Sequence, residues 1–245
     1  MSIGGKTADF ATRHPLGVTL TMLQITLAVG LLAALPSVWP EAFSGLHSVK
    51  VDTDPENMLP ADEPVRVFHD HMKEEMALYD MVVVGVVNEE HPDGVFNPDS
   101  LARVHQIAEF AKTELRWPDP ENPEQEEGVI AIDMIAPSNV DTMRQGDSPG
   151  VVRFEWLMKS PPETAEQARA MRDRARDIPF LNGTLLSEDG KALALYLPLT
   201  SKDVSSRVYD ALNKRISELD GDDQWHITGL PVAEDVFGVE IGRAS

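Results

Sequence analysis

The chain has 245 residues, of which 42% are hydrophobic and 25% charged, an ordinary mixture for a folded protein. It contains no cysteine, which excludes disulfide bonds and thiolate metal sites. The formal net charge is −20, from 21 Lys and Arg against 41 Asp and Glu. So acidic a balance argues against a nucleic acid as partner, because binding phosphates requires clustered cations.

The first element is an apolar run without ionisable side chains, PLGVTLTMLQITLAVGLLAALPSVWP, residues 15–40. About 20 helical residues cross a hydrocarbon core of ~30 Å, so the run predicts a transmembrane helix. A secretory signal peptide and a buried core helix are the alternatives. A signal peptide has a shorter apolar stretch and a small-residue cleavage site, and Pro36, Trp39 and Pro40 crowd that position here. A core helix is rarely apolar over such a length.

The charges that flank this run predict its orientation. Lys6 and Arg13 precede it, and the chain beyond Glu41 is strongly acidic. The positive-inside rule then places residues 1–14 in the cytoplasm. Residues 41–245 are expected on the periplasmic side of the cytoplasmic (inner) membrane, with the lipid bilayer as a partner.

Beyond residue 60 the sequence alternates amphipathic helices with short apolar strands. Residues 63–79 predict a helix with one apolar stripe, and MVVVGVV (81–87) predicts a buried strand. Residues 101–115 predict a second helix, capped by Asp99 or Ser100, and VIAIDMI (129–135) a second strand. The Pro- and Glu-rich stretch 116–128 predicts a solvated loop. The stripe on the first helix comprises Val65, Phe68, Met72, Met76 and Tyr79, and we expect it to pack on a sheet.

The second half repeats this rhythm. Residues 151–158 are expected to be extended, and Thr164 to begin a helix. An Asp-Gly turn within residues 183–199 predicts a hairpin. A helix capped by Asp203 and a strand over residues 224–230 follow. Strand–helix–strand thus occurs twice, which predicts an α+β, ferredoxin-like extracytoplasmic domain with helices on one side of the sheet.

The stretch VDTDPENMLP (51–60) raises the question of a metal site. Asp52, Asp54, Glu56 and Glu63 fit positions of a calcium-binding EF-hand loop, but Asn57 stands where that loop requires glycine. Two prolines also stiffen it. A turn-rich connector is therefore the favoured interpretation.

No other motif indicates catalysis or a cofactor. His69 and His71 lie two apart, on different faces of the predicted helix, and His71 with Glu75 supplies two ligands, too few for a site. The sequence has no nucleophile-elbow, phosphate-loop or dinucleotide motif. We therefore expect no catalytic, metal-binding or cofactor-binding residues, and no enzyme.

The order of the segments resembles a known family. An apolar helix, VDTDPENMLPADEPVRVFHD, MVVVGVV, NGTLLSEDGKALALYLPL and ITGLPVAEDVFG follow one another. This order resembles the first section of a resistance–nodulation–division (RND) exporter of the MMPL type. There, an Asp-Pro motif follows the first membrane helix, and a G-x-P-V-x-x-D segment closes the first extracytoplasmic domain. The resemblance covers residues 15–240.

The resemblance implies a function that the chain would not perform alone. It implies export of lipids or other hydrophobic molecules, with the remaining transporter helices or subunits as partners and this chain as a fragment. A complete single-pass anchored binding or sensor module is the alternative, and the reading frame beyond Ser245 distinguishes the two. The predicted wall of a substrate path comprises Met134, Met143, Phe154 and Trp156, although burial in the core explains the same side chains.

Overall fold

The computed structural model describes residues 10–39, 55–119, 122–145, 148 and 150–235. The chain divides into two compact units, residues 1–52 and 53–245. The first unit holds helix α2 (Pro15–Val38), which continues past Pro36 and exposes most of its apolar side chains. α2 is long and apolar enough to cross a membrane, and a signal sequence near the N-terminus shares these properties.

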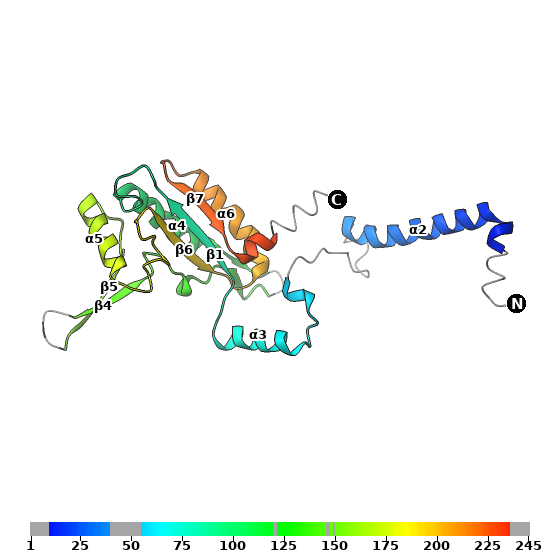
Figure 1. Cartoon of the computed structure of the whole chain (residues 1–245), viewed down its shortest axis with the longest axis horizontal. Coiled ribbons are helices and arrows are strands. Elements are labelled where there is room, and N and C mark those ends of the chain that lie inside the picture. The colour runs from blue at the N-terminus through cyan, green and yellow to red at the C-terminus, as the bar shows by residue number, and fades with distance from the viewer. Residues whose placement is uncertain (1–9, 40–54, 120–121, 146–147, 149, 236–245) are drawn as a thin grey trace. The chain divides into compact units, whose positions relative to one another are not determined.

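The second unit is a mixed helix and sheet structure built on a three-stranded antiparallel sheet. Its strand order is β6 (Ala192–Pro198), β1 (Met81–Val87), β7 (Gln224–Thr228) (Figure 1). Side chains alternate between the two faces of a strand, and Val84 lies opposite Leu195 on the buried face. The prediction of a buried strand over residues 81–87 is confirmed. The buried side chains of the hydrophobic core found among the described residues lie between Val82 and Val232, so this core belongs to the second unit.

Helices α4 (Pro98–Glu114) and α6 (Ser205–Ser217) contribute their buried faces to the same core as the sheet. The predicted helix at residues 101–115 is therefore confirmed, but its predicted cap is wrong. The cap is Asn97, whose Oδ1 accepts a hydrogen bond from Ser100 N at 2.9 Å. Pro98 occupies the first helical position, where its missing N–H costs nothing.

The segment expected to form a second strand, residues 129–135, is broken by a 3₁₀ turn, η2 (Ala131–Asp133). Only its ends pair with the outer edge of β6, through bridges from Val129 to Leu199 and from Ile135 to Tyr196. The preceding stretch forms a short hairpin of β2 (Arg116–Pro118) and β3 (Glu126–Gly128), so the expectation of a loop over all of residues 116–128 is wrong.

Of the two helices predicted in the second half of the chain, one begins at its predicted residue and the other does not. Thr164 caps α5 (Ala165–Arg176) as predicted, with its side chain accepting from Gln167 N. α6 is instead preceded by the 3₁₀ turn η3 (Lys202–Val204), which Ser201 caps in place of Asp203.

The turn before β6 is closed by a carboxylate. Asp189 Oδ1 accepts hydrogen bonds from Ser187 Oγ at 2.6 Å and from Lys191 N at 3.0 Å. These bonds favour the ionised carboxylate and lower the pKa of Asp189, with the Ser187 bond contributing most. Of the hairpin predicted over residues 183–199, only β6 is a regular strand, and its partner is reduced to a bridge between Leu186 and Leu193.

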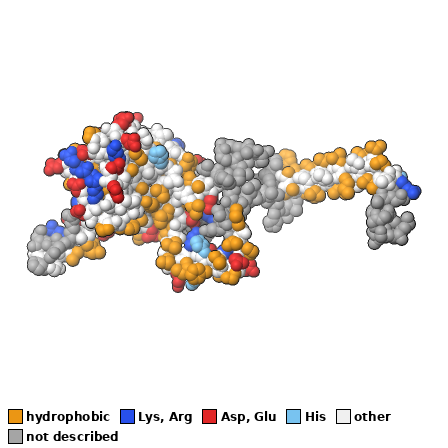
Figure 2. Space-filling view, viewed as in Figure 1, with side chains coloured by type: hydrophobic (Ala, Val, Ile, Leu, Met, Phe, Trp, Pro, Cys, Tyr) orange, Lys and Arg blue, Asp and Glu red, His pale blue; other side chains and the backbone are white. Residues whose placement is uncertain are grey.

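Helix α3 (Pro64–Glu75) follows the short 3₁₀ turn η1 (Pro55–Met58) and forms where predicted. Its apolar stripe does not pack on the sheet, which corrects our expectation. Val65, Phe68 and Met76 are 67%, 64% and 60% exposed. Hydrophobic side chains accordingly gather over the surface of α3 (Figure 2).

Candidate functional site

A two-stranded hairpin projects from the body of the second unit (Figure 1). Its strands are β4 (Asp141–Gln145) and β5 (Val152–Trp156), paired antiparallel with Met143 opposite Phe154 and Asp141 opposite Trp156. Only β5 was predicted to be extended. The signal for β5 is the alternation of apolar residues in VRFEW, whereas DTMRQ in β4 has a single apolar residue and gives no comparable signal.

The register places the apolar side chains of the hairpin on one face. Residues opposite each other across an antiparallel pair share a face, and so do residues two apart along a strand. Met143, Phe154 and Trp156 therefore lie on one side, and they are 73%, 67% and 51% exposed. Val152 joins this face and is also exposed. We call these four residues the apolar hairpin face.

The base of the hairpin is fixed to the core. Leu157 and Met158 directly follow β5 and are buried, and Leu157 N donates to Val140 O at 2.9 Å. From α5, Arg174 donates to Leu157 O at 3.1 Å. The apolar hairpin face thus lies on a hairpin that is anchored to the core at its base. The pairing of the two strands places these side chains together on an exposed face.

The structure separates Met134 from the other three predicted wall residues. Met134 is 3% exposed and belongs to the hydrophobic core. Burial in the core was the alternative explanation for all four predicted wall residues, and for Met134 it is the correct one. The sequence reasoning missed Val152 and Ile132. Ile132 is 88% exposed in the turn η2, a position that no periodic pattern marks.

A cavity of about 520 Å³ lies beside the base of the hairpin. Trp156 and Ile132 contribute apolar surface to its lining, and His105, Glu109 and Lys112 of α4 contribute polar groups. Ser138, Asn139 and Lys159 also line it, so polar side chains outnumber apolar ones, and the apolar surface of the candidate site comes mainly from the hairpin. This cavity and the apolar hairpin face share Trp156, and together they form the candidate site.

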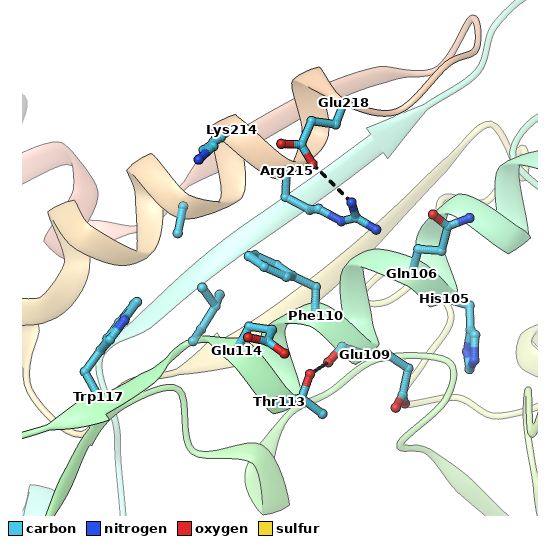
Figure 3. Close-up of a pocket in the computed structure, with 12 residues that line it drawn as sticks. His105, Gln106, Glu109, Phe110, Thr113, Glu114, Trp117, Lys214, Arg215 and Glu218 are labelled. Carbon is cyan, nitrogen blue, oxygen red and sulfur yellow. Dashed lines mark hydrogen bonds and ion pairs between the residues drawn. The ribbon is translucent and has the colours of Figure 1, made fainter.

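A larger hollow of about 770 Å³ lies between α4 and α6 (Figure 3). Phe110 lies near its centre, with the guanidinium of Arg215 6.0 Å from the ring centroid and ion-paired with Glu218 at 3.1 Å. Its lining combines Glu109 and Glu114 of α4, and Glu218 directly after α6, with Lys214 and Arg215 of α6. Because these charges are of both signs, the hollow offers no clear preference for one class of ligand.

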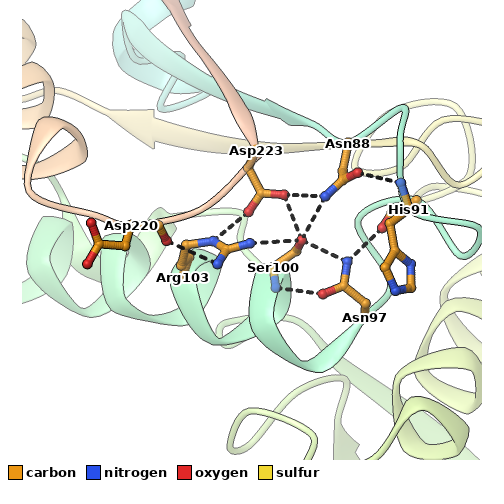
Figure 4. A network of polar contacts seen from close by, with 8 residues as sticks. Asn88, His91, Asn97, Ser100, Arg103, Asp220 and Asp223 are labelled. Atoms are coloured by element: carbon orange, nitrogen blue, oxygen red, sulfur yellow. Dashed lines mark hydrogen bonds and ion pairs between the residues drawn. The ribbon is translucent and has the colours of Figure 1, made fainter.

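A buried polar cluster joins the residue after β1 and the first turns of α4 to the residue before β7, more than 100 residues later in the chain (Figure 4). The side chain of Asp223, which precedes β7, is only 1% exposed. It accepts hydrogen bonds from Asn88 Nδ2 at 2.8 Å, Ser100 Oγ at 2.6 Å and Arg103 Nε at 2.6 Å. Both of its carboxylate oxygens accept hydrogen bonds from protein donors, so we interpret the cluster as a structural clamp between β1, α4 and β7.

Within the described part of the chain, no three His, Asp or Glu side chains lie close enough to hold a metal ion. Residues 52 and 54 of the EF-hand comparison lie outside the described residues. His71 and Glu75 lie on the same exposed face of α3 as expected, with His71 Nε2 3.8 Å from Glu75 Oε2.

Comparison with known proteins finds no family model that matches the chain and no curated protein similar to it. The function must therefore be inferred from the geometry of the site and from the order of the sequence segments.

Proposed function

We propose that the chain is the first membrane span and first extracytoplasmic domain of an RND-superfamily exporter of the MMPL type, and that the apolar hairpin face contacts its hydrophobic substrate. The observation that carries the proposal is the set of Met143, Phe154 and Trp156 on one rooted, exposed face. Exposed apolar groups gathered in this way mark binding sites more often than chance surface residues do. The substrate class is a lipid or another hydrophobic molecule.

The topology of the second unit supports the comparison with this family. The order β7–β1–β6 continues at the outer edge of β6 with the interrupted segment 129–135. With α4 and α6 as the two crossovers, this order matches that of a ferredoxin-like domain whose second strand in chain order is interrupted. We therefore propose a ferredoxin-like relationship for this unit, with the β4–β5 hairpin and α5 as an insertion before β6.

The proposed orientation uses α2 as the span. Its stretch Pro15–Pro36 is free of ionisable side chains, and Arg13 precedes it. The N-terminus would be cytoplasmic and the second unit periplasmic, at the inner membrane. Further helices encoded in frame beyond Ser245 would support the exporter, and a stop codon there would favour the anchored binding module.

The binding proposal is tested with residues 53–245, a unit that contains the core described above. The probe is N-phenyl-1-naphthylamine, a neutral dye that fluoresces on entering an apolar site. We expect saturable binding, weakened at least tenfold by the double change Met143→Ser and Phe154→Ser.

The matched control is Arg153→Ser, the exposed neighbour of Phe154 on the opposite face of β5. Because the dye is neutral, removing the charge of Arg153 should not change its affinity. We therefore expect the control to bind the dye as tightly as the unaltered protein does. Equal affinity in the double variant, with circular dichroism unchanged, would contradict the assignment of the site to the hairpin.

A further inference from the structure

Helix α3 presents a second apolar surface, separate from the candidate site. Val65, Phe68 and Met76 are each more than half exposed, and Met72, which lies between them in the stripe, is partly exposed. One turn of an α-helix takes 3.6 residues, so these positions follow one side of the helix and its C-terminal end. The stripe covers α3 and does not continue onto the apolar hairpin face.

The apolar exposure begins before the helix. Met58 and Leu59, in and after the turn η1, are 82% and 45% exposed. Both lie in the connection between α2 and α3 in the sequence. Exposed apolar residues are therefore present just before α3 as well as on it.

Polar side chains of α3 form hydrogen bonds and an ion pair with the flanking segments, whereas the apolar stripe is exposed. Arg66 donates to Leu59 O at 2.8 Å and to Asn57 Oδ1 at 2.7 Å. Near the other end, Lys73 forms an ion pair with Asp80 at 3.2 Å. These contacts hold the helix to its own flanking segments and leave the stripe turned away from them.

A second copy of the chain is a poor occupant for this stripe. A helix of 12 residues is about 18 Å long at 1.5 Å per residue. Two such stripes packed on each other would bury far less than the ~1,200 Å² of a stable protein interface. A bilayer has no such size limit, and α2 would keep α3 at its surface at high effective concentration.

We propose that α3 lies flat in the lipid headgroup layer, with Val65, Phe68, Met72 and Met76 directed toward the acyl chains. Short helices with one apolar stripe and a charged opposite face bind membranes in this way. The proposal rests on α2 being a membrane span. Arg66 and Lys73 are balanced by acidic residues on the same helix, so apolar burial drives the contact and a zwitterionic bilayer is sufficient.

The test uses the full chain, which has no native cysteine and therefore accepts single spin labels without background. Labels are placed at Val65→Cys, Phe68→Cys and Met76→Cys on the stripe, and at Asp70→Cys, about 140° around the helix from Val65. The protein is reconstituted in phosphatidylcholine vesicles. Electron paramagnetic resonance then compares the accessibility of each label to oxygen, which dissolves in lipid, and to a nickel complex, which stays in water.

We expect the oxygen-to-nickel accessibility ratio of the stripe labels to exceed that of the Asp70 label severalfold. Stripe labels as accessible to nickel as the Asp70 label would show that the stripe faces water and would overturn the proposal. Stripe labels shielded from both reagents would also overturn it, because they would indicate a protein cover. Three stripe positions guard against one variant that fails to fold, which circular dichroism would identify.

A label at Leu27→Cys, inside α2, separates this inference from the proposed function. A lipid-exposed Leu27 label with water-exposed stripe labels would reject the placement of α3 alone. A water-exposed Leu27 label would reject the membrane span itself.

Discussion

Met143 and Phe154 stand opposite each other across the β4–β5 ladder, and both side chains are more than two-thirds exposed. Cross-strand apolar pairs normally stabilise a hairpin by about 0.2–1 kcal/mol. The exposure of this pair means that most of its apolar surface contributes nothing to the folding of the unit. That surface is available for binding.

The hairpin and the core should respond differently to truncation. Phe154→Ala removes an exposed side chain, so we expect the free energy of unfolding to fall by less than about 1 kcal/mol. Met134→Ala empties a core position and should cost about 2–5 kcal/mol. Urea unfolding of residues 53–245, followed by circular dichroism, measures both. A large loss for Phe154→Ala would place its side chain in the packing of the unit.

The Asp223 clamp should be essential to stability. Asp223→Ala leaves Arg103 without its carboxylate and Ser100 Oγ without its acceptor, and it leaves Asn88 Nδ2 only the 3.4 Å hydrogen bond to Ser100 Oγ. Breaking a buried charge pair in this way typically costs about 3–5 kcal/mol. Asp222→Ala, at the exposed neighbouring position, should change the free energy of unfolding by less than about 0.5 kcal/mol. Similar losses in the two variants would refute the clamp.

Gly229, the first residue of the G-x-P-V-x-x-D segment, should not tolerate a side chain. Its φ is +137°, and an added Cβ would lie 2.3 Å from the carbonyl oxygen of Met81. Gly229→Ala should therefore destabilise the unit by more than about 1 kcal/mol. Gly183→Ala is the control, because Gly183 also has a positive φ but open space around its Cβ position. Thermal unfolding compares them, and a smaller loss for Gly229→Ala would contradict the role of the close approach.

The orientation of the chain can be tested with a reporter. Alkaline phosphatase is active only after export, so a fusion after Ser245 should be active in a bacterial host. Replacing Lys6 and Arg13 by Glu removes the positive flank and should reduce that activity. An inactive fusion after Ser245, made in normal amount and retained in the membrane, would reverse the proposed topology.

The elements with strong periodicity were predictable, and the caps show why some boundaries were not. Asn97, Asp99 and Ser100 all have side chains suited to capping α4. Pro98 decides among them, because proline favours the first helical position and so makes its predecessor the cap. The apolar stretch 129–135 gave no such signal. It was predicted as a continuous strand, but its middle turns outward at Ile132.

The presence of an apolar face could be predicted from the sequence, but what packs against that face could not. The stripe of α3 and the alternation of β5 were both evident in the sequence, but an amphipathic pattern does not state what will cover it. The apolar stripe of α4 packs in the core, where Leu101 and Val104 are fully buried, whereas the apolar stripe of α3 is exposed. For the site, Phe154 and Trp156 required only the period of a strand. Met143 was also predicted, but its place on the same face depends on the register of β4 with β5, and the exclusion of Met134 depends on its burial in the core.

The central place of β1 in the sheet has a consequence for synthesis of the chain. Both of its neighbours come late, since β6 begins at Ala192 and β7 at Gln224, whereas β1 ends at Val87. A ribosome adding about 5–20 residues per second takes roughly 5–20 s to make the ~100 residues before β6. During this interval the run MVVVGVV has two unpaired edges and the composition of an aggregation-prone segment. The central strand, β1, is thus synthesised long before either of the two strands that pair with it.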